Sequence, residues 1–172
     1  MTQIKPKLGS FLVDAYDIYK ITAIKDQPDK KGKDETFVFY GPVTPSGNNQ
    51  EVYSSIPLAN FSRANLRPPL TADQVKLFFK ALSKPTSDFV YSFNTAKDLV
   101  YKNNPELLIP LLHHLWANQH ALTKSEIEFM ENIFCHLISE IAFVTKKKPL
   151  VVKDKLHRIL NSAVSVTPSL KK

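Results

Sequence analysis

The chain has 172 residues, 43% of them hydrophobic, which is enough for one domain of usual size or two small ones with real cores. No apolar run approaches the roughly 18 residues needed to cross a membrane, and the first residues lack an apolar signal segment. A folded, soluble, cytoplasmic protein is therefore expected. The single cysteine, Cys135, excludes an internal disulfide and a zinc site made of cysteines alone, and its sulfur is expected to serve packing.

The net charge of +7 is unevenly distributed along the chain. Residues 1–70 contain nine Lys or Arg against seven Asp or Glu, whereas residues 71–172 contain fourteen against nine. A phosphate backbone is the usual partner of such a basic excess, but a solvated surface accounts for it equally well. The charge alone leaves both interpretations open.

The first third of the sequence predicts short β-strands. β-Branched and aromatic residues cluster in four short runs, at positions 9–13, 18–25, 36–40 and 52–56. The segments between them are rich in Pro, Gly and polar residues, as in turns. Because so small a sheet must curl to protect its edges, a compact barrel of the SH3 or Tudor type is predicted.

After residue 66 the periodicity changes from two residues to 3.6, which predicts a helical domain and an α+β chain. Thr71 and Gln74 have capping-box spacing, so a helix is expected from there to a point before Pro85. Asn94 is predicted to cap the next helix. We expect a third helix to begin at Pro105 and to be kinked or delayed by Pro110.

A second capping box, formed by Thr123 and Glu126, predicts the longest helix. Its buried face is expected to consist of Ile127, Met130, Ile133, Phe134, Leu137, Ile138 and Ile141. A last helix is predicted over residues 153–164. The predicted domains are thus residues 1–66 and 67–166, followed by a frayed tail at 167–172.

Several segments carry a family resemblance. They are Ile56-Pro57-Leu58-Ala59-Asn60, Asn65-Leu66-Arg67, His114-Leu115-Trp116, Leu122-Thr123 with Glu126, and Glu140-Ile141-Ala142. In this order and spacing, over residues 9–145, the chain resembles the CarD-like (CdnL) bacterial transcription regulators. Asn65 stands where the family has glycine, a mild change because asparagine tolerates a left-handed backbone.

The resemblance implies an N-terminal Tudor-like domain that binds the RNA polymerase β subunit. It also implies a helical domain that contacts promoter DNA at the upstream edge of the transcription bubble and stabilises the open complex. The protein would then be cytoplasmic and associated with the nucleoid through polymerase. The predicted polymerase-binding residues are Lys25, Gln27, Ser55, Ile56 and Pro57, with strand addition to a sheet edge as one route of docking.

The family inserts a tryptophan wedge into DNA from the segment that corresponds here to residues 88–93. Phe89 occupies the wedge position, Tyr91 lies two residues on, and no arginines follow. An apolar ring can wedge an unstacked base step, but these rings could equally pack between helices. The predicted DNA-binding residues are Phe89, Tyr91, Lys84, Lys97 and Lys124.

Three other features have simpler explanations. Trp116 follows Leu112 by four residues on an apolar stripe, so core packing is expected. The lysines at 146–148 are expected to complement a helix C-terminus, although they could also follow a phosphate backbone. The five histidines lack zinc-site spacing, so neither a metal nor a cofactor is predicted.

Enzymatic activity is not expected, because no serine has a glycine-rich elbow and Cys135 lies within an amphipathic helix. A monomer is predicted. Two alternatives to the regulator remain open: a protein-interaction module whose helical domain does not bind DNA, and a general nucleic-acid-binding protein that does not contact polymerase. The face that carries Phe89 and Tyr91 discriminates between them, because gathered basic residues there would favour DNA.

Overall fold

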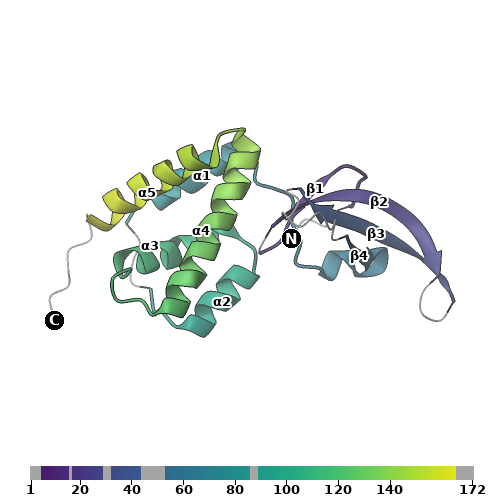
Figure 1. Cartoon of the computed structure of the whole chain (residues 1–172), viewed down its shortest axis with the longest axis horizontal. Helices are drawn as coiled ribbons and strands as arrows, with labels where there is room; N and C mark the ends of the chain where they lie inside the picture. Colours follow the sequence, from purple (N-terminus) through teal and green to yellow (C-terminus); the bar gives the residue numbers. More distant parts are fainter. Residues whose placement is uncertain (1–4, 16, 29–31, 44–52, 86–88, 166–172) are drawn as a thin grey trace. The chain divides into compact units, whose positions relative to one another are not determined.

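The computed structural model describes residues 5–15, 17–28, 32–43, 53–85 and 89–165, and for Ser165 only the backbone. The chain is α+β and divides into two compact units, residues 1–69 and 70–172 (Figure 1). The sequence predicted the change of unit at residue 66. Arg67 remains with the first unit because its backbone N–H and C=O pair with those of Val13, at 3.0 and 2.8 Å.

The first unit contains an open, four-stranded antiparallel sheet. Its strands follow one another in chain order: β1 Phe11–Val13, β2 Ile18–Pro28, β3 Asp34–Pro42 and β4 Ser54–Pro57. All four lie close to the predicted runs, although β2 and β3 are longer. The described strands leave β1 and β4 at the edges of this sheet, and closure into the predicted barrel is not seen among them.

One face of the sheet carries the core of this unit. Leu12, Ile21 and Val38 are buried there, together with Phe61 from the 3-10 helix η1, Leu58–Arg63. A bulge between Ile21 and Ala23 shifts the register of β2 against β3. The short helix therefore covers the face that the strands cannot bury by themselves.

The second unit consists of helices: α1 Ala72–Leu82, α2 Phe93–Tyr101, the 3-10 helix η2 Pro105–Leu108, α3 Ile109–Ala117, α4 Lys124–Thr145 and α5 Pro149–Ser165. Both predicted capping boxes are present, at Thr71 with Gln74 and at Thr123 with Glu126. The late start expected from Pro110 is confirmed, because this proline lies in the first turn of α3 and η2 precedes it. No helix among the described residues is long and apolar enough to cross a membrane.

Two predicted helix starts are wrong. The cap of α2 is Ser92 rather than Asn94: Ser92 has an extended backbone, and its Oγ accepts a hydrogen bond from the Thr95 N–H at 3.2 Å. The last helix begins at Pro149, four residues earlier than predicted, because proline needs no backbone donor at the first helical position.

The core of the helical unit surrounds α3 and the middle of α4. Leu111, Leu112 and Leu115 are fully buried. Core packing of Trp116 is confirmed, because its ring lies against this cluster and its Nε1 donates to Asn161 Oδ1 at 2.9 Å. Two polar groups also serve the packing: His113 Nε2 lies 2.7 Å from Leu82 O, and the fully buried Glu140 accepts a hydrogen bond from Leu70 N at 2.8 Å.

Two expectations about α4 are corrected. Ile127 is 36% exposed, because the apolar stripe begins one turn before the buried part of the helix at Met130. Cys135 is exposed, because it lies beside the buried stripe formed by Phe134, Leu137 and Ile138 rather than within it. Its sulfur therefore does not contribute to the core.

Candidate functional site

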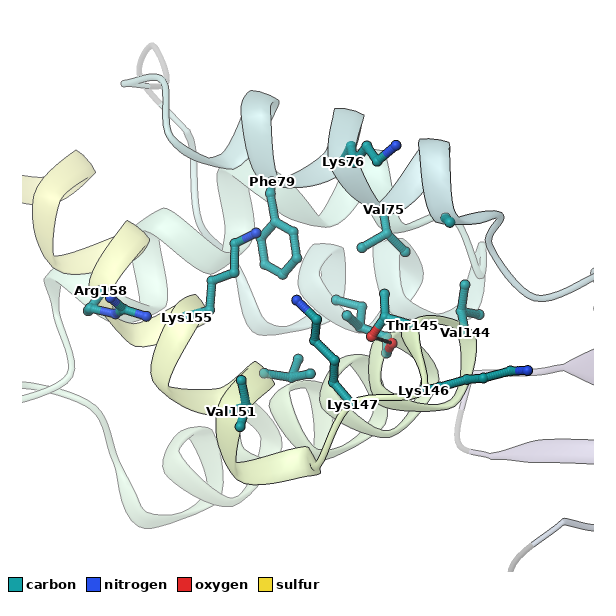
Figure 2. A pocket seen from close by; sticks show the side chains of 13 residues that line it. Val75, Lys76, Phe79, Val144, Thr145, Lys146, Lys147, Val151, Lys155 and Arg158 are labelled. Carbon is teal, nitrogen blue, oxygen red and sulfur yellow. Dashed lines mark hydrogen bonds between the residues drawn. The ribbon is translucent and has the colours of Figure 1, made fainter.

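A cleft of about 480 Å³ lies between α1, the end of α4 and α5 (Figure 2). Apolar side chains from all three helices line it: Val75, Phe79, Ile141, Val144, Val151 and Val152. Val75 and Phe79 are four residues apart on α1, and Ile141 and Val144 are three apart on α4, so one face of each of these helices points to the cleft; α5 contributes the adjacent Val151 and Val152. Most of them also belong to the core of the unit, which makes the floor rigid.

Five cations surround this floor: Lys76, Lys146, Lys147, Lys155 and Arg158. Lys76 belongs to α1, Lys146 and Lys147 lie in the turn between α4 and α5, and Lys155 and Arg158 belong to α5. No carboxylate is among the described residues that line the cleft. The cleft therefore presents positive charge above an apolar surface.

The turn between α4 and α5 brings two of the lysines to the cleft. Lys146 ends α4 in a left-handed conformation, with φ at 53°, and the N–H of Lys147 donates to Ala142 O at 3.2 Å. Pro149 then starts α5 after two further residues. Left-handed backbone is costly for lysine, so the tight connection is maintained at the cost of local strain.

Lys147 and Lys155 extend toward the Phe79 ring, whereas Lys146 points away from it (Figure 2). Lys155 Nζ lies 4.0 Å from the centre of the Phe79 ring. Lys76 differs from the others because it pairs with Asp73 at 2.8 Å, and this hydrogen bond raises the pKa of Lys76. Salt bridges among the described residues do not involve Lys147, Lys155 or Arg158.

The predicted wedge rings are packed between helical elements. Tyr91 stacks on His114 with ring centres 4.6 Å apart, and Phe89 contacts the same imidazole at 5.9 Å. Both rings are half-buried against the helical core, whereas Val90 between them is 88% exposed. Of the two arrangements that the sequence left open, the structure therefore has the inter-helix packing.

The surroundings of Tyr91 include a negative charge. Burial and the nearby Glu126 carboxylate raise the pKa of Tyr91 to about 12. Burial lowers the pKa of His114, and hydrogen bonds with Thr123 lower that of Glu126. A neutral imidazole and an ionised carboxylate next to the rings do not attract a phosphate backbone.

The three predicted DNA-binding lysines come from three different helices or their ends. Lys97 Nζ lies 4.3 Å from the centre of the Phe93 ring, Lys124 pairs with Glu128 at 3.9 Å, and Lys84 is exposed after the end of α1. None of them lines the cleft. Because α4 spans 22 residues and is therefore about 33 Å long, its two ends form separate surfaces.

The structure brings together most of the predicted polymerase-binding residues on the sheet. In the register, Lys25 lies opposite Phe37, which lies opposite Pro57, and Ser55 lies opposite Phe39. Directly opposite residues share a face, so these side chains occupy the face away from the buried core. Lys25 Nζ lies 4.8 Å from the centre of the Phe39 ring on this face.

The other two predicted residues differ. Gln27 lies two residues after Lys25 on β2 and therefore points to the same face, opposite Glu35. Ile56 pairs with Val38 and packs on the core, so its side chain points to the opposite face. Four of the five residues thus share a surface with two half-buried phenylalanines, and Ile56 supports the sheet from behind.

Sequence reasoning missed Lys155 and Arg158. In the sequence, Val151, Lys155 and Arg158 recur at spacings of four and three residues, which places them in one row along a helix. The predicted helix began at residue 153, so it left out Val151, the apolar residue of this row.

Among the described residues no group of His, Cys, Asp and Glu is arranged to hold a metal ion. No known protein-family model and no curated protein sequence matches the chain.

Proposed function

We propose that this protein is a transcription regulator similar to the CarD-like family. The first unit binds the RNA polymerase β subunit, and the helical unit contacts promoter DNA at the upstream edge of the transcription bubble. The result is a longer-lived open complex. The observation that carries the proposal is the cleft, whose described lining residues include five cations and no carboxylate.

Phosphate contact follows from the charge of this cleft. Lysine and arginine side chains that approach phosphates release condensed counterions, which makes binding favourable and dependent on salt. Lys147, Lys155 and Arg158 are exposed, so their charges are accessible to a DNA backbone. Contacts to phosphates do not distinguish one base sequence from another, which suits a protein that is directed to promoters by polymerase.

Polymerase docking uses the outer face and the edge of the sheet. Phe37 and Phe39 supply apolar area there, and Lys25 adds a positive charge. Edge strand β4 has one side outside the described sheet, and an extended segment of polymerase would pair with it by strand addition. Closure of the sheet into a Tudor-like barrel belongs to this proposal.

Tethering explains how a modest DNA contact takes effect. A unit held on polymerase by its neighbour meets the promoter at a high effective concentration, so few phosphate contacts are enough. The segment with Phe89 and Tyr91 remains the predicted wedge. Insertion of either ring would first require loss of its packing on His114, so the cleft is the better supported contact.

The test is the lifetime of the open complex on a promoter fragment with the cognate polymerase. The wild-type protein is expected to lengthen it, and Lys147→Glu with Lys155→Glu is expected to abolish the effect. The matched control is Lys148→Glu with Lys153→Glu, which changes two exposed lysines of the same region that do not line the cleft. No lengthening by the wild type, or equal loss in both double variants, would contradict the proposal.

A second candidate is a protein-interaction module whose helical unit does not bind DNA. The packing of Phe89 and Tyr91 beside Glu126 favours it, because this removes the predicted wedge from the surface. The module predicts polymerase binding without any change in open-complex lifetime. The same experiment therefore separates the two functions.

A further inference from the structure

The floor of the cleft has a chemistry that DNA contact does not need. Val75, Phe79, Ile141 and Val152 form an apolar surface beneath the cations, and Val151 at the edge is 50% exposed. A DNA backbone binds through its phosphate and sugar oxygens, which gain nothing from valine and phenylalanine side chains. A ligand that uses the whole cleft needs an apolar part as well as a negative charge.

The two parts of the cleft are arranged for such a ligand. Lys147 and Lys155 approach the Phe79 side, so an acid group placed between them meets two ammonium groups (Figure 2). Lys155 already covers the Phe79 ring at 4.0 Å. Its long flexible chain can turn the ammonium to an acid group while its methylenes stay on the apolar floor.

We propose that the cleft binds a single anionic amphiphile, with its apolar tail on the valines and Phe79 and its acid group between Lys147 and Lys155. Charge complementarity identifies this occupant, because the described part of the chain lines the cleft with cations and with no carboxylate. A volume of about 480 Å³ is within the range of sites for one small molecule. A regulatory consequence rests on the proposed function: the bound acid group occupies the lysines that would contact DNA.

The first test is titration calorimetry of the full chain with decanoate, below the concentration at which it forms micelles. Decanoate is expected to bind with a negative heat-capacity change, because apolar surface is buried. Octanoate should bind about tenfold more weakly, because it lacks two methylenes. Decanol lacks the charge and butyrate lacks the tail, so either one binding as tightly as decanoate would overturn the proposal.

Matched variants place the ligand in the cleft. Val151→Asp adds a carboxylate at the edge of the cleft and is expected to weaken decanoate binding at least tenfold. Leu150→Asp changes the neighbouring residue, which is 67% exposed and does not line the cleft, and should bind decanoate normally. Both positions are exposed, so the fold is expected to survive. Equal loss in both variants, or loss in neither, would mean that decanoate binds elsewhere and would overturn the proposal.

Vesicles distinguish a free amphiphile from a membrane surface. The protein is expected to stay in the supernatant when vesicles of phosphatidylglycerol and phosphatidylcholine are sedimented. Sedimentation of the wild type that is lost in Val151→Asp would assign the cleft to a lipid surface and overturn the proposal of a single bound amphiphile.

DNA competition separates failure of this inference from failure of the proposed function. Decanoate is expected to displace a fluorescent promoter fragment from the wild type. Binding of decanoate without displacement would keep the ligand site but place the DNA contact elsewhere. DNA binding that needs Lys147 and Lys155, together with no decanoate binding, would keep the proposed function and remove the ligand site.

Discussion

The two ends of α4 differ in chemistry although one helix supports both. Near its start, Tyr91 is stacked on His114 beside Glu126, so an aromatic cluster is packed next to a negative charge. At its end, Lys146 and Lys147 join Lys155 around an apolar cleft that no carboxylate lines among the residues described. The two predicted wedge rings therefore lie apart from the cleft cations, whereas the sequence grouped these rings with Lys84, Lys97 and Lys124.

The largest expected effect tests which end contacts DNA. Lys147→Glu with Lys155→Glu should lower the affinity for a promoter fragment by roughly two orders of magnitude at low salt, because repulsion replaces two phosphate contacts. The plot of log affinity against log salt should also become shallower by roughly two units. Fluorescence anisotropy over a series of salt concentrations measures both quantities.

The opposite end of the helix supplies the comparison for that experiment. Lys97→Glu with Lys124→Glu reverses the same amount of charge on α2 and at the start of α4, where Lys124 already pairs with Glu128. Only a small loss of affinity is expected, and the slope of log affinity against log salt should stay the same. If this variant lost more affinity than the cleft variant, the DNA contact would lie on the surface that the sequence predicted and the cleft would not be the site.

The second effect concerns the role of the Tyr91 ring. Tyr91→Ala should lower the free energy of unfolding of the helical unit by about 2 kcal/mol, because a half-buried ring and its stacking on His114 are lost. Trp116 is the only tryptophan, so its fluorescence in a urea titration follows this unit. Val90→Ala is the control and should cost less than about 0.5 kcal/mol, because Val90 is 88% exposed.

An unchanged free energy of unfolding in Tyr91→Ala, combined with a shorter open-complex lifetime, would contradict the structural role. It would mean that the ring leaves His114 in the complex and acts as the predicted wedge. The same variant therefore distinguishes packing from insertion.

Local chemistry explains why much of the fold could be predicted. Thr71 with Gln74 and Thr123 with Glu126 satisfy helix-end donors within four residues, so their effect does not depend on the rest of the protein. The strand runs were equally local. The wrong helix starts also have local causes, because the Ser92 hydroxyl and Pro149 each form a better first turn than Asn94 and Lys153.

The cleft could not be predicted, because its residues come together only through packing. Phe79 on α1 meets Lys155 on α5 across 76 positions of sequence, and no periodicity within one helix reveals that contact. The sheet face with Lys25, Ser55 and Pro57 could be predicted in part. The alternation of side chains along a strand predicts which residues share a face, but the bulge in β2 and the register with β3 determine which phenylalanines lie next to them.

A smaller effect, this time an increase in stability, is expected from a substitution at Lys146, the left-handed residue beside the cleft. Lys146→Gly should raise the free energy of unfolding by up to about 1 kcal/mol, because glycine adopts a φ of 53° without steric cost. Lys148→Gly is the control and should not stabilise the protein, since its φ is not positive. A destabilised Lys146→Gly variant in the urea titration would show that the Lys146 side chain contributes more to stability than its backbone strain costs.

The smallest effect is a pH dependence at the aromatic end of α4. Burial lowers the pKa of His114 below its ordinary value of 6.5, so the unfolded chain binds more protons than the folded one just below that pH. Stability should therefore decrease as the pH falls through 6.5 and level off below the folded-state pKa. Urea titrations followed by circular dichroism should give a flatter pH profile for His114→Gln.

His157 provides a comparison at the middle of α4, where its ring contacts Phe134 and where burial and the Lys153 charge lower its pKa as well. Lys153→Gln removes that charge and should reduce the slope that His157 contributes, without changing the slope from His114. If Lys153→Gln and His114→Gln flattened the same part of the profile by non-additive amounts, the surroundings of the two histidines would be energetically coupled. Additive changes would mean that His114 and His157 titrate in independent environments along the helix.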